Sequence, residues 1–497
     1  MATGLPDQVA DLTEQYDICL HELRAARHQI EAYAAYCQQN RLAVDAPVLA
    51  RLADDAGFAG LRIGRQRRAL QARSPAYAAD LLTSSEAVLR FGLATLAYVR
   101  NALEWCAASY AQSGSVQFFD TGAQGSPLMN YDRNGTQAGV RRVERQLLEV
   151  LDFPAEQYGL SVTSSGMAAF TVVESFLVRD RLRPGDTVLL APYTYYEATE
   201  QLTALPFVTV ERAAGWSVQE IVADVLRLRP RVLSVDPIAN TARQRMIDLP
   251  GLFARLRKVL SQPLTVVVDG TMLPATMPVE LMAGDEHLEV VYYESCTKYA
   301  QLGMDASMAG LVAYPIALQE RFDQLRRNAG AVLFRHNAEL FPRYRREFLR
   351  RRMRRICANA TRLAALLDAD PRVTAVASVH HPALSRHPDR GIADTLPYAS
   401  GIVTFLYHDT ARNSYEELDR MADVLVRNTV ELGVEFTKGV SFGYSVPRVW
   451  IQVIGGVEPH FARISVGDRS HQLEPLAEAI ARAVIAEVTP SDGVIAA

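Results

Sequence analysis

The residues with the clearest chemical potential follow two apolar runs in the middle of the chain. Lys298 lies within Glu294–Tyr299, just after the run 288–292, and Asp269 follows the run 264–268. An ammonium ion is costly to bury without a partner, and burial lowers the pKa of a lysine, which favours Schiff-base formation with an aldehyde. A lone buried carboxylate also needs a partner, and a protonated pyridine nitrogen is a suitable one. The alternatives are a surface lysine at a strand end and, for the aspartate, a helix cap or a metal ligand, although no second carboxylate or histidine lies near it in the sequence.

Two further segments have the composition of an anion site. The sequence Ser-Ser-Gly-Met-Ala-Ala at 164–169 follows a short apolar run and opens a helical pattern. Small residues such as Gly166 allow backbone N–H groups to approach a phosphate at a helix N-terminus, although an ordinary helix cap has the same composition. Ser295 and Thr297 would present hydroxyl groups to a phosphate on the same side as Lys298.

The elements that must position these residues alternate between apolar runs and helical segments from about 116 to 330. The apolar runs are 159–163, 187–191, 232–235, 264–268 and 288–292. This alternation predicts βαβ units and an α/β fold with a mostly parallel sheet. Each run ends in a polar or glycine-containing cluster, and open α/β sheets bind ligands beyond the carboxyl ends of their strands, so the clusters are expected to converge on one ligand. One cluster contains Tyr195 and Tyr196, whose rings suit either stacking on a flat cofactor or core packing.

The flanking regions differ in pattern from this central region. Apolar residues recur at helical spacing up to about residue 115, with breaks expected at Pro47 and at Gly57–Gly60. After 331, a helix with eight arginines between Arg343 and Arg355 leads into a smaller α+β region that is expected to close one side of the site. We interpret these arginines as a solvated or intersubunit ion-paired face, and an anionic substrate or a polynucleotide is the alternative.

The composition argues against several classes of protein. Hydrophobic residues make up 49% and charged residues 22% of the 497 residues, as in ordinary globular proteins. A net charge of −4 argues against a dedicated nucleic-acid binder, and the absence of a run of about eighteen uncharged apolar residues argues against a membrane span. Five scattered cysteines without a CxxC pair indicate neither a zinc site nor a disulfide framework, so a reducing, cytoplasmic location is expected. His380, His381 and His387 lie near prolines and are predicted to be surface residues, and no metal site is expected.

Seven short motifs follow one another along the chain: Tyr131–Arg133, Ser164–Met167, Tyr196–Thr199, Pro237–Asn240, Asp269–Thr271, Ser295–Tyr299 and Arg463–Gly467. Their order resembles that of the Cys/Met metabolism family of pyridoxal-phosphate (PLP) enzymes, which includes cystathionine γ-synthase, cystathionine β-lyase and methionine γ-lyase. The resemblance runs from about 118 to 487 and implies fold type I. It implies a large PLP-binding α/β domain at 118–330 and a smaller C-terminal α+β domain at 331–497, after an N-terminal helical extension at 1–117 that ordinary members lack.

The resemblance also implies roles for individual residues. Lys298 would carry the cofactor as a Schiff base and shuttle protons, Asp269 would pair with the pyridine nitrogen, and Tyr196 would stack on the ring and take part in catalysis. Arg463, helped by Ser441, would grip the α-carboxylate of the amino-acid substrate. The other cofactor contacts would be Ser165, Gly166, Met167, Ser295 and Thr297 at the phosphate, Asn240 at the phenolic oxygen, and Tyr131 and Arg133 at the phosphate of a neighbouring subunit. The last pair implies a homodimer or homotetramer.

Departures from the family pattern favour a specialised biosynthetic member. Glycine replaces the middle residue of Asp-Asn-Thr at 269–271, and Glu197 and Ala198 replace a Gly-Gly or Gly-Cys pair. We expect PLP-dependent γ-replacement on O-activated homoserine or S-adenosylmethionine through a vinylglycine-type quinonoid intermediate, with a carbon or sulfur nucleophile, a nicotinamide nucleotide included. The alternative is a carbon–sulfur lyase that performs β- or γ-elimination on a sulfur amino acid. A non-catalytic binding protein is a more distant alternative, disfavoured by the retention of both Lys298 and Arg463.

Overall fold

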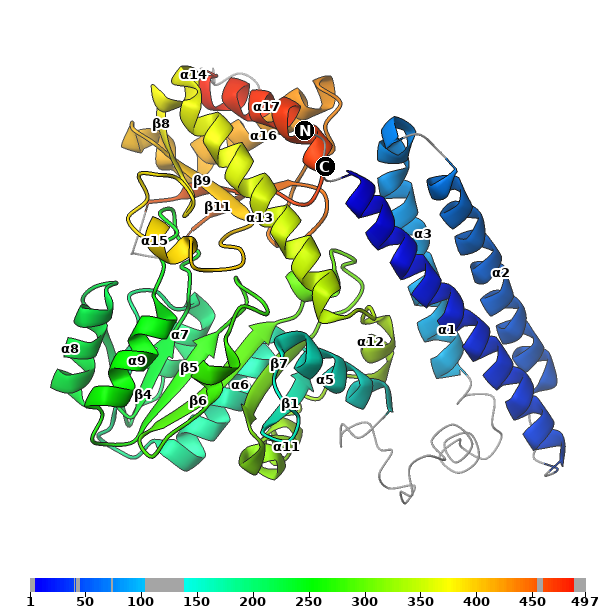
Figure 1. Cartoon of the computed structure of the whole chain (residues 1–497), viewed down its shortest axis with the longest axis horizontal. Helices are drawn as coiled ribbons and strands as arrows, with labels where there is room; N and C mark the ends of the chain where they lie inside the picture. Colours follow the sequence, from blue (N-terminus) through cyan, green and yellow to red (C-terminus); the bar gives the residue numbers. More distant parts are fainter. Residues whose placement is uncertain are drawn as a thin grey trace.

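The structure, a computed structural model, shows three parts that lie side by side. It describes residues 5–39, 41, 45–72, 75–102, 138–453 and 459–486, with the side chains of 75–78 left out. Figure 1 shows a bundle of long helices beside a part built on a large sheet and a part built on a smaller one. No helix within the described ranges has the length and apolarity needed to cross a membrane.

The N-terminal part, here called the bundle, consists of three long helices. These are α1 (Leu5–Gln39), α2 (Ala46–Gln71) and α3 (Pro75–Ala102). The side chain of Asp45 caps α2 by accepting a hydrogen bond from the Val48 N–H at 3.1 Å, with Pro47 in the first turn, so the expected break there is confirmed. The break expected at Gly57–Gly60 is wrong, because both glycines lie inside α2. A glycine costs about 1 kcal/mol within a helix, which the packing of a 26-residue helix against its neighbours outweighs.

The large sheet has seven strands in the order β1-β7-β6-β5-β4-β2-β3. The strands are β1 (Tyr158–Thr163), β2 (Thr187–Leu190), β3 (Thr209–Arg212), β4 (Val232–Val235), β5 (Leu264–Asp269), β6 (Leu288–Ser295) and β7 (Gly310–Pro315). β7 runs antiparallel to β1 and β6, and the remaining pairs are parallel, so the predicted α/β fold with a mostly parallel sheet is confirmed. β3 and β7 were not expected from the sequence. β3 lies at the exposed edge and has no apolar run to reveal it.

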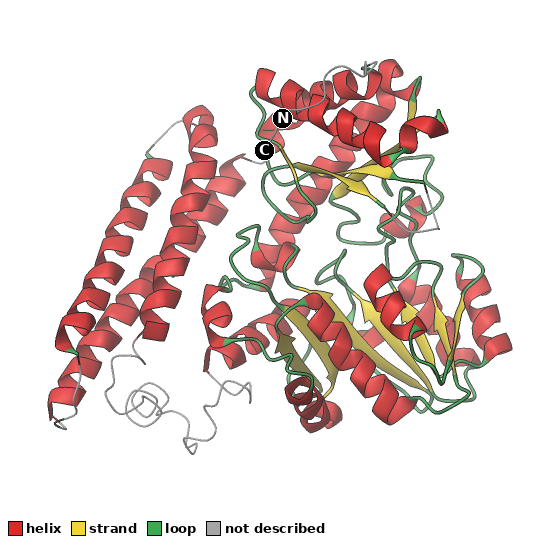
Figure 2. Cartoon of the chain, turned by 180° about the vertical axis from the view of Figure 1, so that it is seen from behind, coloured by secondary structure: helices red, strands yellow, loops and turns green. Residues whose placement is uncertain are grey.

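Helices cover both faces of the large sheet (Figures 1 and 2). They are α5 (Ala138–Leu151), α6 (Gly166–Phe176), α7 (Tyr196–Thr203), α8 (Val218–Leu228), α9 (Leu249–Val259), α10 (Val279–Met282) and α11 (Gln319–Asn328). Successive strand residues point to opposite faces, so Val266 and Val268 belong to one buried cluster and Val267 to another. Burial on both faces explains why the central strands read as continuous apolar runs.

The smaller sheet has five strands in the order β10-β11-β12-β9-β8. They are β8 (Ala377–His380), β9 (Ile402–Tyr407), β10 (Thr437–Lys438), β11 (Arg448–Gln452) and β12 (Phe461–Ser465). The associated helices are α12 (Arg335–Leu340), α13 (Arg346–Ala369), α14 (Pro371–Thr374), α15 (Arg390–Ala393), α16 (Tyr415–Glu431) and α17 (Leu473–Ile485). Figure 1 shows α13 crossing from the large sheet to the smaller one on the side that faces the bundle.

Two surface predictions in this part are wrong for some of their residues. Arg345, Arg351 and Arg354 are exposed as expected. Arg352 and Arg355 of α13 are instead covered by the bundle, and Arg355 pairs with Asp11 of α1 at 2.8 Å. His381 and His387 are also buried rather than exposed. Each lies within hydrogen-bond distance of a backbone carbonyl, which compensates for lost hydration.

Candidate functional site

A cavity of about 560 Å³ lies where strands of the large sheet end, facing the smaller sheet. The predicted site residues that line it are Ser165, Gly166, Met167, Tyr196, Asn240, Asp269, Ser295, Thr297, Lys298 and Arg463. Ser441 is not among the lining residues but contacts the Lys298 side chain. Tyr131 and Arg133 lie outside the described residues. The structure thus brings together in one cavity residues from the ends of several strands and from β12 of the other sheet.

Lys298 projects into this cavity from the segment that follows β6. Its Nζ atom donates a hydrogen bond to Ser441 Oγ at 2.9 Å and lies 5.4 Å from the centre of the Phe442 ring. Burial and, second, the nearby positive charge of Arg463 together lower the pKa of Lys298 to about 8. A substantial fraction of the amine is therefore neutral near physiological pH. A neutral amine is what nucleophilic addition to an aldehyde requires.

Asp269 ends β5 at the bottom of the cavity and is 7% exposed. Its Oδ1 atom accepts a hydrogen bond from the Thr271 N–H at 2.9 Å. Burial raises the pKa of Asp269, although its hydrogen bonds with Thr271 and Tyr293 oppose the rise. The neighbouring Asp236 is also buried, and burial followed by repulsion from Asp269 raises its pKa well above the ordinary value. Two adjacent buried carboxylates favour a cationic ligand group, which the protonated ring of PLP would supply.

The glycine that follows Asp269 has a steric cause. A Cβ atom at Gly270 would lie 1.8 Å from the hydroxyl oxygen of Tyr292, which is buried and donates a hydrogen bond to Glu294. The asparagine usual at this position in the family therefore has no room here. Tyr292 and Glu294 occupy this space instead, and the Asp269 carboxylate still lines the cavity.

The N-terminus of α6 faces the cavity and has the geometry of an anion cradle. The Ser165 side chain caps the helix by accepting a hydrogen bond from the Ala168 N–H at 3.0 Å, so the alternative interpretation of this segment as a helix cap is confirmed. A Cβ atom at Gly166 would lie 2.5 Å from Ser295 Cβ, so only glycine allows this close approach. Ser295 Oγ and Thr297 Oγ1 are 2.8 Å apart beside it. Backbone N–H groups and two hydroxyls are thus available to a phosphate.

Three tyrosines from the β2–α7 segment line the wall of the cavity: Tyr193, Tyr195 and Tyr196. The Tyr196 side chain is 46% exposed, and its hydroxyl donates to Glu197 Oε1 at 2.9 Å. Its ring centre lies 5.1 Å from that of Tyr195 in an edge-on arrangement. Burial, followed by the neighbouring Glu197, raises the pKa of Tyr196, so its hydroxyl keeps its proton at neutral pH. Tyr193 was not expected at the site.

Arg463 projects from the middle of β12 and is 3% exposed. Its Nη1 atom donates to Asn240 Oδ1 at 3.3 Å and to Gln452 Oε1 at 3.2 Å, and its Nη2 atom donates to the Val440 carbonyl. Its Nε atom is buried without a hydrogen-bond partner among the described residues. Burial lowers the pKa of this guanidinium to about 10. A buried cation that lacks a carboxylate partner among the described residues, beside a cavity, is suited to bind the carboxylate of a ligand.

Several residues that line the cavity were not named as site residues from the sequence, although Asp236 belongs to one of the clusters expected to converge on a ligand. Asp236, Tyr293, Phe442, Trp450 and Gln452 all line the cavity. Asp236 directly follows the run 232–235, so its position at a strand end was the available signal. Tyr293 and Trp450 lie inside strands and Phe442 lies before β11, so none of them had such a signal. Gln452 ends β11, a strand that was not predicted from the sequence.

Comparisons with known proteins place these features in context. A profile of the family described as "Cys/Met metabolism PLP-dependent enzyme" matches residues 102–434. The chain is 35% identical over 379 residues to "Bifunctional enzyme flvA" of Aspergillus flavus, an alignment that covers 75% of this chain but 44% of that protein. It is 30% identical over 291 residues to "L-methionine gamma-lyase" of Pseudomonas putida, which covers 54% of this chain and 67% of the lyase.

Solved structures with a similar fold include a methionine gamma lyase and a cystathionine gamma synthase. The methionine gamma lyase CalE6 of Micromonospora echinospora superimposes with a TM-score of 0.58 at 25% identity, over 73% of this chain and 90% of CalE6. Cystathionine gamma synthase of Xanthomonas oryzae pv. oryzae, in complex with cystathionine, has a TM-score of 0.57 at 21% identity and covers 73% of this chain and 88% of that one. At that identity the second likeness concerns the fold alone, which is that of PLP-dependent enzymes of fold type I.

Proposed function

The chain belongs to the Cys/Met metabolism family of PLP-dependent enzymes, and from this premise we propose that it catalyses γ-replacement on an activated four-carbon amino acid. The proposed donors are O-activated homoserine and S-adenosylmethionine. The proposed acceptor is a carbon or sulfur nucleophile, with nicotinamide nucleotides among the candidates. The observation that carries the amino-acid part of the proposal is the spacing of an amine and a guanidinium around one ring: Lys298 Nζ and Arg463 Cζ lie 5.4 Å and 5.5 Å from the centre of Phe442. The substrate α-carbon would lie between them.

The residues of the cavity fit PLP. Asp269 would face the pyridine nitrogen, the N-terminus of α6 with Ser295 and Thr297 would hold the phosphate, and Tyr196 would lie against the ring. Asn240 would contact the phenolic oxygen. When bound, the cofactor withdraws electrons from the substrate α-carbon and so acidifies its proton.

The side chains of this chain then have separable tasks. Arg463 would orient the substrate α-carboxylate, with Ser441 beside it. Lys298 would accept the proton from Cα and return it later, which its pKa of about 8 permits near neutral pH. Tyr196 would hold its proton until the substituent departs from Cγ. These tasks apply to replacement and to elimination alike.

The size and lining of the cavity favour replacement. In addition to Arg463, the lining includes Met308, Tyr415, Trp450 and Val453, and Met308 is 59% exposed. A cavity of about 560 Å³ has room for a second substrate beside a cofactor and a small amino acid. A carbon–sulfur lyase, which eliminates from a sulfur amino acid, is the second candidate, and the similarity to L-methionine gamma-lyase supports it.

We also propose a homodimer or homotetramer in which Tyr131 and Arg133 of one subunit reach the phosphate of the next. Analytical ultracentrifugation would measure the assembly. Loss of cofactor affinity in an Arg133→Met variant that keeps its assembly would support the role of that residue.

Mass spectrometry of reaction products tests the proposed function. The chain, supplied with PLP, is incubated with O-acetylhomoserine or S-adenosylmethionine, with and without a thiol, an enolisable carbonyl compound or a nicotinamide nucleotide. A product that joins the four-carbon unit to the added nucleophile supports replacement. Release of ammonia and a 2-oxo acid at an unchanged rate whether or not a nucleophile is present supports the lyase. Absence of both products with every donor contradicts the proposal, and Lys298→Ala is the matched inactive control.

A further inference from the structure

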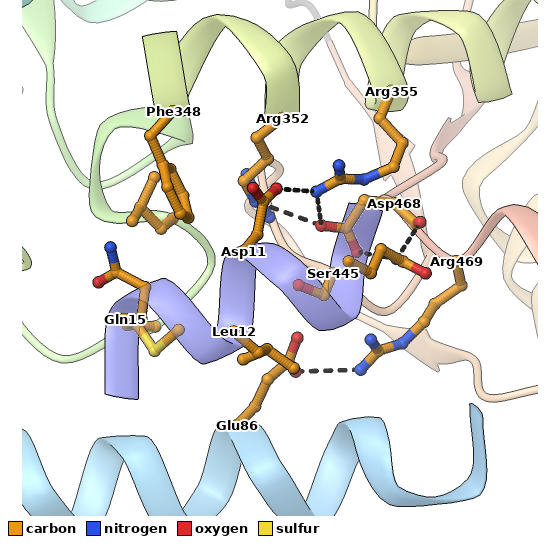
Figure 3. A pocket seen from close by; sticks show the side chains of 13 residues that line it. Asp11, Leu12, Gln15, Glu86, Phe348, Arg352, Arg355, Ser445, Asp468 and Arg469 are labelled. Carbon is orange, nitrogen blue, oxygen red and sulfur yellow. Dashed lines mark hydrogen bonds and ion pairs between the residues drawn. The ribbon is translucent and has the colours of Figure 1, made fainter. Parts of the chain in front are cut away.

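A buried cluster of charges joins the bundle to the rest of the molecule. The junction cluster, as we call it, consists of Asp11 (α1), Glu86 (α3), Arg352 and Arg355 (α13), and Asp468 and Arg469 after β12. None of the six side chains is more than 9% exposed. Figure 3 shows these side chains meeting from three helices and one loop around a small cavity. Charges at this depth are rare unless they are paired.

The ion pairs of the cluster match three carboxylates with three guanidiniums. Arg355 lies 2.8 Å from Asp11 and 3.6 Å from Asp468, Arg352 lies 3.4 Å from Asp468, and Arg469 lies 3.1 Å from Glu86. Burial raises the pKa of Asp468, but the three guanidiniums outweigh it and hold that pKa below its usual range. The bundle supplies two of the three carboxylates. Arg355 therefore depends on the bundle for part of its charge balance, and Arg469 does so together with Glu435, which lies 3.3 Å from it outside the bundle.

Arg352 connects this cluster to the lysine of the active site. Its Nη2 atom donates a hydrogen bond to the Gly443 carbonyl at 2.9 Å. Gly443 has a φ of +91°, and a Cβ atom there would lie 2.6 Å from the carbonyl carbon of Lys298. Two residues earlier, Ser441 accepts the hydrogen bond from Lys298 Nζ. Arg352 thus fixes a backbone segment that contacts both the backbone and the side chain of Lys298.

The bundle also holds the segment that follows Lys298. Arg90 of α3 donates to the Gly303 carbonyl at 3.3 Å, and a Cβ atom at Gly303 would lie 2.9 Å from Arg352 Nη2. The next residue, Met304, packs into the hydrophobic core of the bundle. The bundle therefore contacts the segment that follows Lys298 directly. It is connected to the segment 441–443, which lies beside Lys298 in space, through the junction cluster and Arg352.

We propose that the bundle is a positioning element of the active site, which acts through the junction cluster and Arg90 on the two backbone segments beside Lys298. Asp11, Glu86 and Arg90 are positioning residues and touch no substrate. Their task is to fix the distance between Lys298 and Arg463, since Asp468 follows β12, the strand that carries Arg463. For the roles of those two residues the inference rests on the proposed function.

Hydrogen–deuterium exchange on the full-length chain with PLP tests the coupling without any turnover. In an Asp11→Asn/Glu86→Gln double variant, we expect amides of 298–306 and 440–446 to exchange on the order of tenfold faster, while those of β5 are unchanged. The matched control is Glu31→Gln, which removes an exposed ion pair with Arg27 on the same helix α1. Unchanged exchange in both segments of a folded double variant would overturn the proposal, even if the chain catalyses the proposed reaction.

Steady-state kinetics of the same variants distinguish a positioning role of the bundle from a role in stability alone. We expect the KM for the amino acid to rise on the order of tenfold at temperatures well below the unfolding transition, with cofactor retained. Arg90→Gln changes an exposed side chain and so gives a folded variant if the double variant unfolds. Arg90→Lys should restore part of the loss, because it keeps a donor near Gly303. A lower melting temperature with unchanged kcat and KM in Arg90→Gln would reduce the bundle to a purely structural role and refute the proposal.

Discussion

The active-site cavity and the junction cluster both bury several charges, but they differ in how far these charges are paired within the protein. In the cavity, Asp236 and Asp269 adjoin each other, and Arg463 has no carboxylate partner among the described residues. In the junction cluster, each carboxylate has a guanidinium within 3.6 Å. Buried charge that the protein leaves unmatched indicates where a ligand completes the structure, whereas buried charge that is matched internally indicates a fixed contact between parts. The comparison predicts that removing a charge has opposite consequences in the two places.

The largest effect is expected at Lys298. Lys298→Ala should lower turnover by about 10²–10⁴-fold or more, because it removes the group that moves protons at the substrate. The stability of the cofactor-free chain should not fall, since a buried ammonium with a lowered pKa contributes no favourable ion pair. Steady-state kinetics and urea unfolding of the same preparation measure both quantities. A large loss of stability would show that Lys298 has a stabilising partner within the protein, as the charges of the junction cluster do.

The opposite pattern is expected at Asp468. Asp468→Asn should destabilise the chain by about 3–5 kcal/mol, because Arg352, Arg355 and Arg469 would lose a shared buried partner. Urea unfolding followed by circular dichroism measures this loss, and Glu31→Gln should change stability by less than about 1 kcal/mol. A cost at Asp468 as small as that at Glu31 would remove the distinction between the two regions.

A smaller effect of opposite sign is expected at Asp269. In the cofactor-free chain, Asp269→Asn should leave stability unchanged or raise it by about 1–3 kcal/mol, because one of two repelling buried carboxylates becomes neutral. The same variant should bind PLP more weakly, which fluorescence titration would detect. If Asp269→Asn instead destabilised the cofactor-free chain, the carboxylate would have a partner within the protein.

The smallest effect concerns pH. Asp236 and Asp269 have raised pKa values when folded, so the folded chain binds more protons than the unfolded chain above about pH 4. Stability of the cofactor-free chain should therefore be fully present below that pH and decline as pH rises through the folded pKa values. Bound PLP should weaken this decline, since its ring nitrogen carries a proton beside the carboxylates. Melting temperatures from pH 4.5 to 8 with and without PLP would show it, and Asp236→Asn should flatten the cofactor-free curve.

The sequence alone predicted the position of a site residue where that residue follows the end of a buried strand. The run 264–268 placed Asp269, and the run 288–292 placed Lys298, because buried parallel strands read as apolar runs and their ends share one edge. Asp236 ends a third such run. A polar residue directly after an apolar run was thus the signal that could be used.

Contacts between distant segments could not be predicted in the same way. The arginines of α13 have the composition of a solvated face, and nothing in their spacing reveals that Asp11, more than 300 positions earlier, covers them. His381 is buried by tertiary packing, which its neighbours in the sequence do not indicate. The distance from Lys298 to Phe442 and Arg463 also depends on how the two sheets pack. Tyr131 and Arg133 remain predictions from motif resemblance.

The contact between Gln8 and Asp468 has a consequence for biosynthesis. The Gln8 side-chain amide donates to Asp468 Oδ1 at 3.1 Å across 460 positions of sequence. Synthesis runs from the N-terminus, so α1 leaves the ribosome long before Asp468, and this contact forms only after Asp468 has been translated. The three N-terminal helices have a hydrophobic core largely their own, which allows them to fold during that wait. The lysine segment would acquire its final geometry late, so a nascent chain would remain without turnover until the segments that contact it, up to Asp468, have been made.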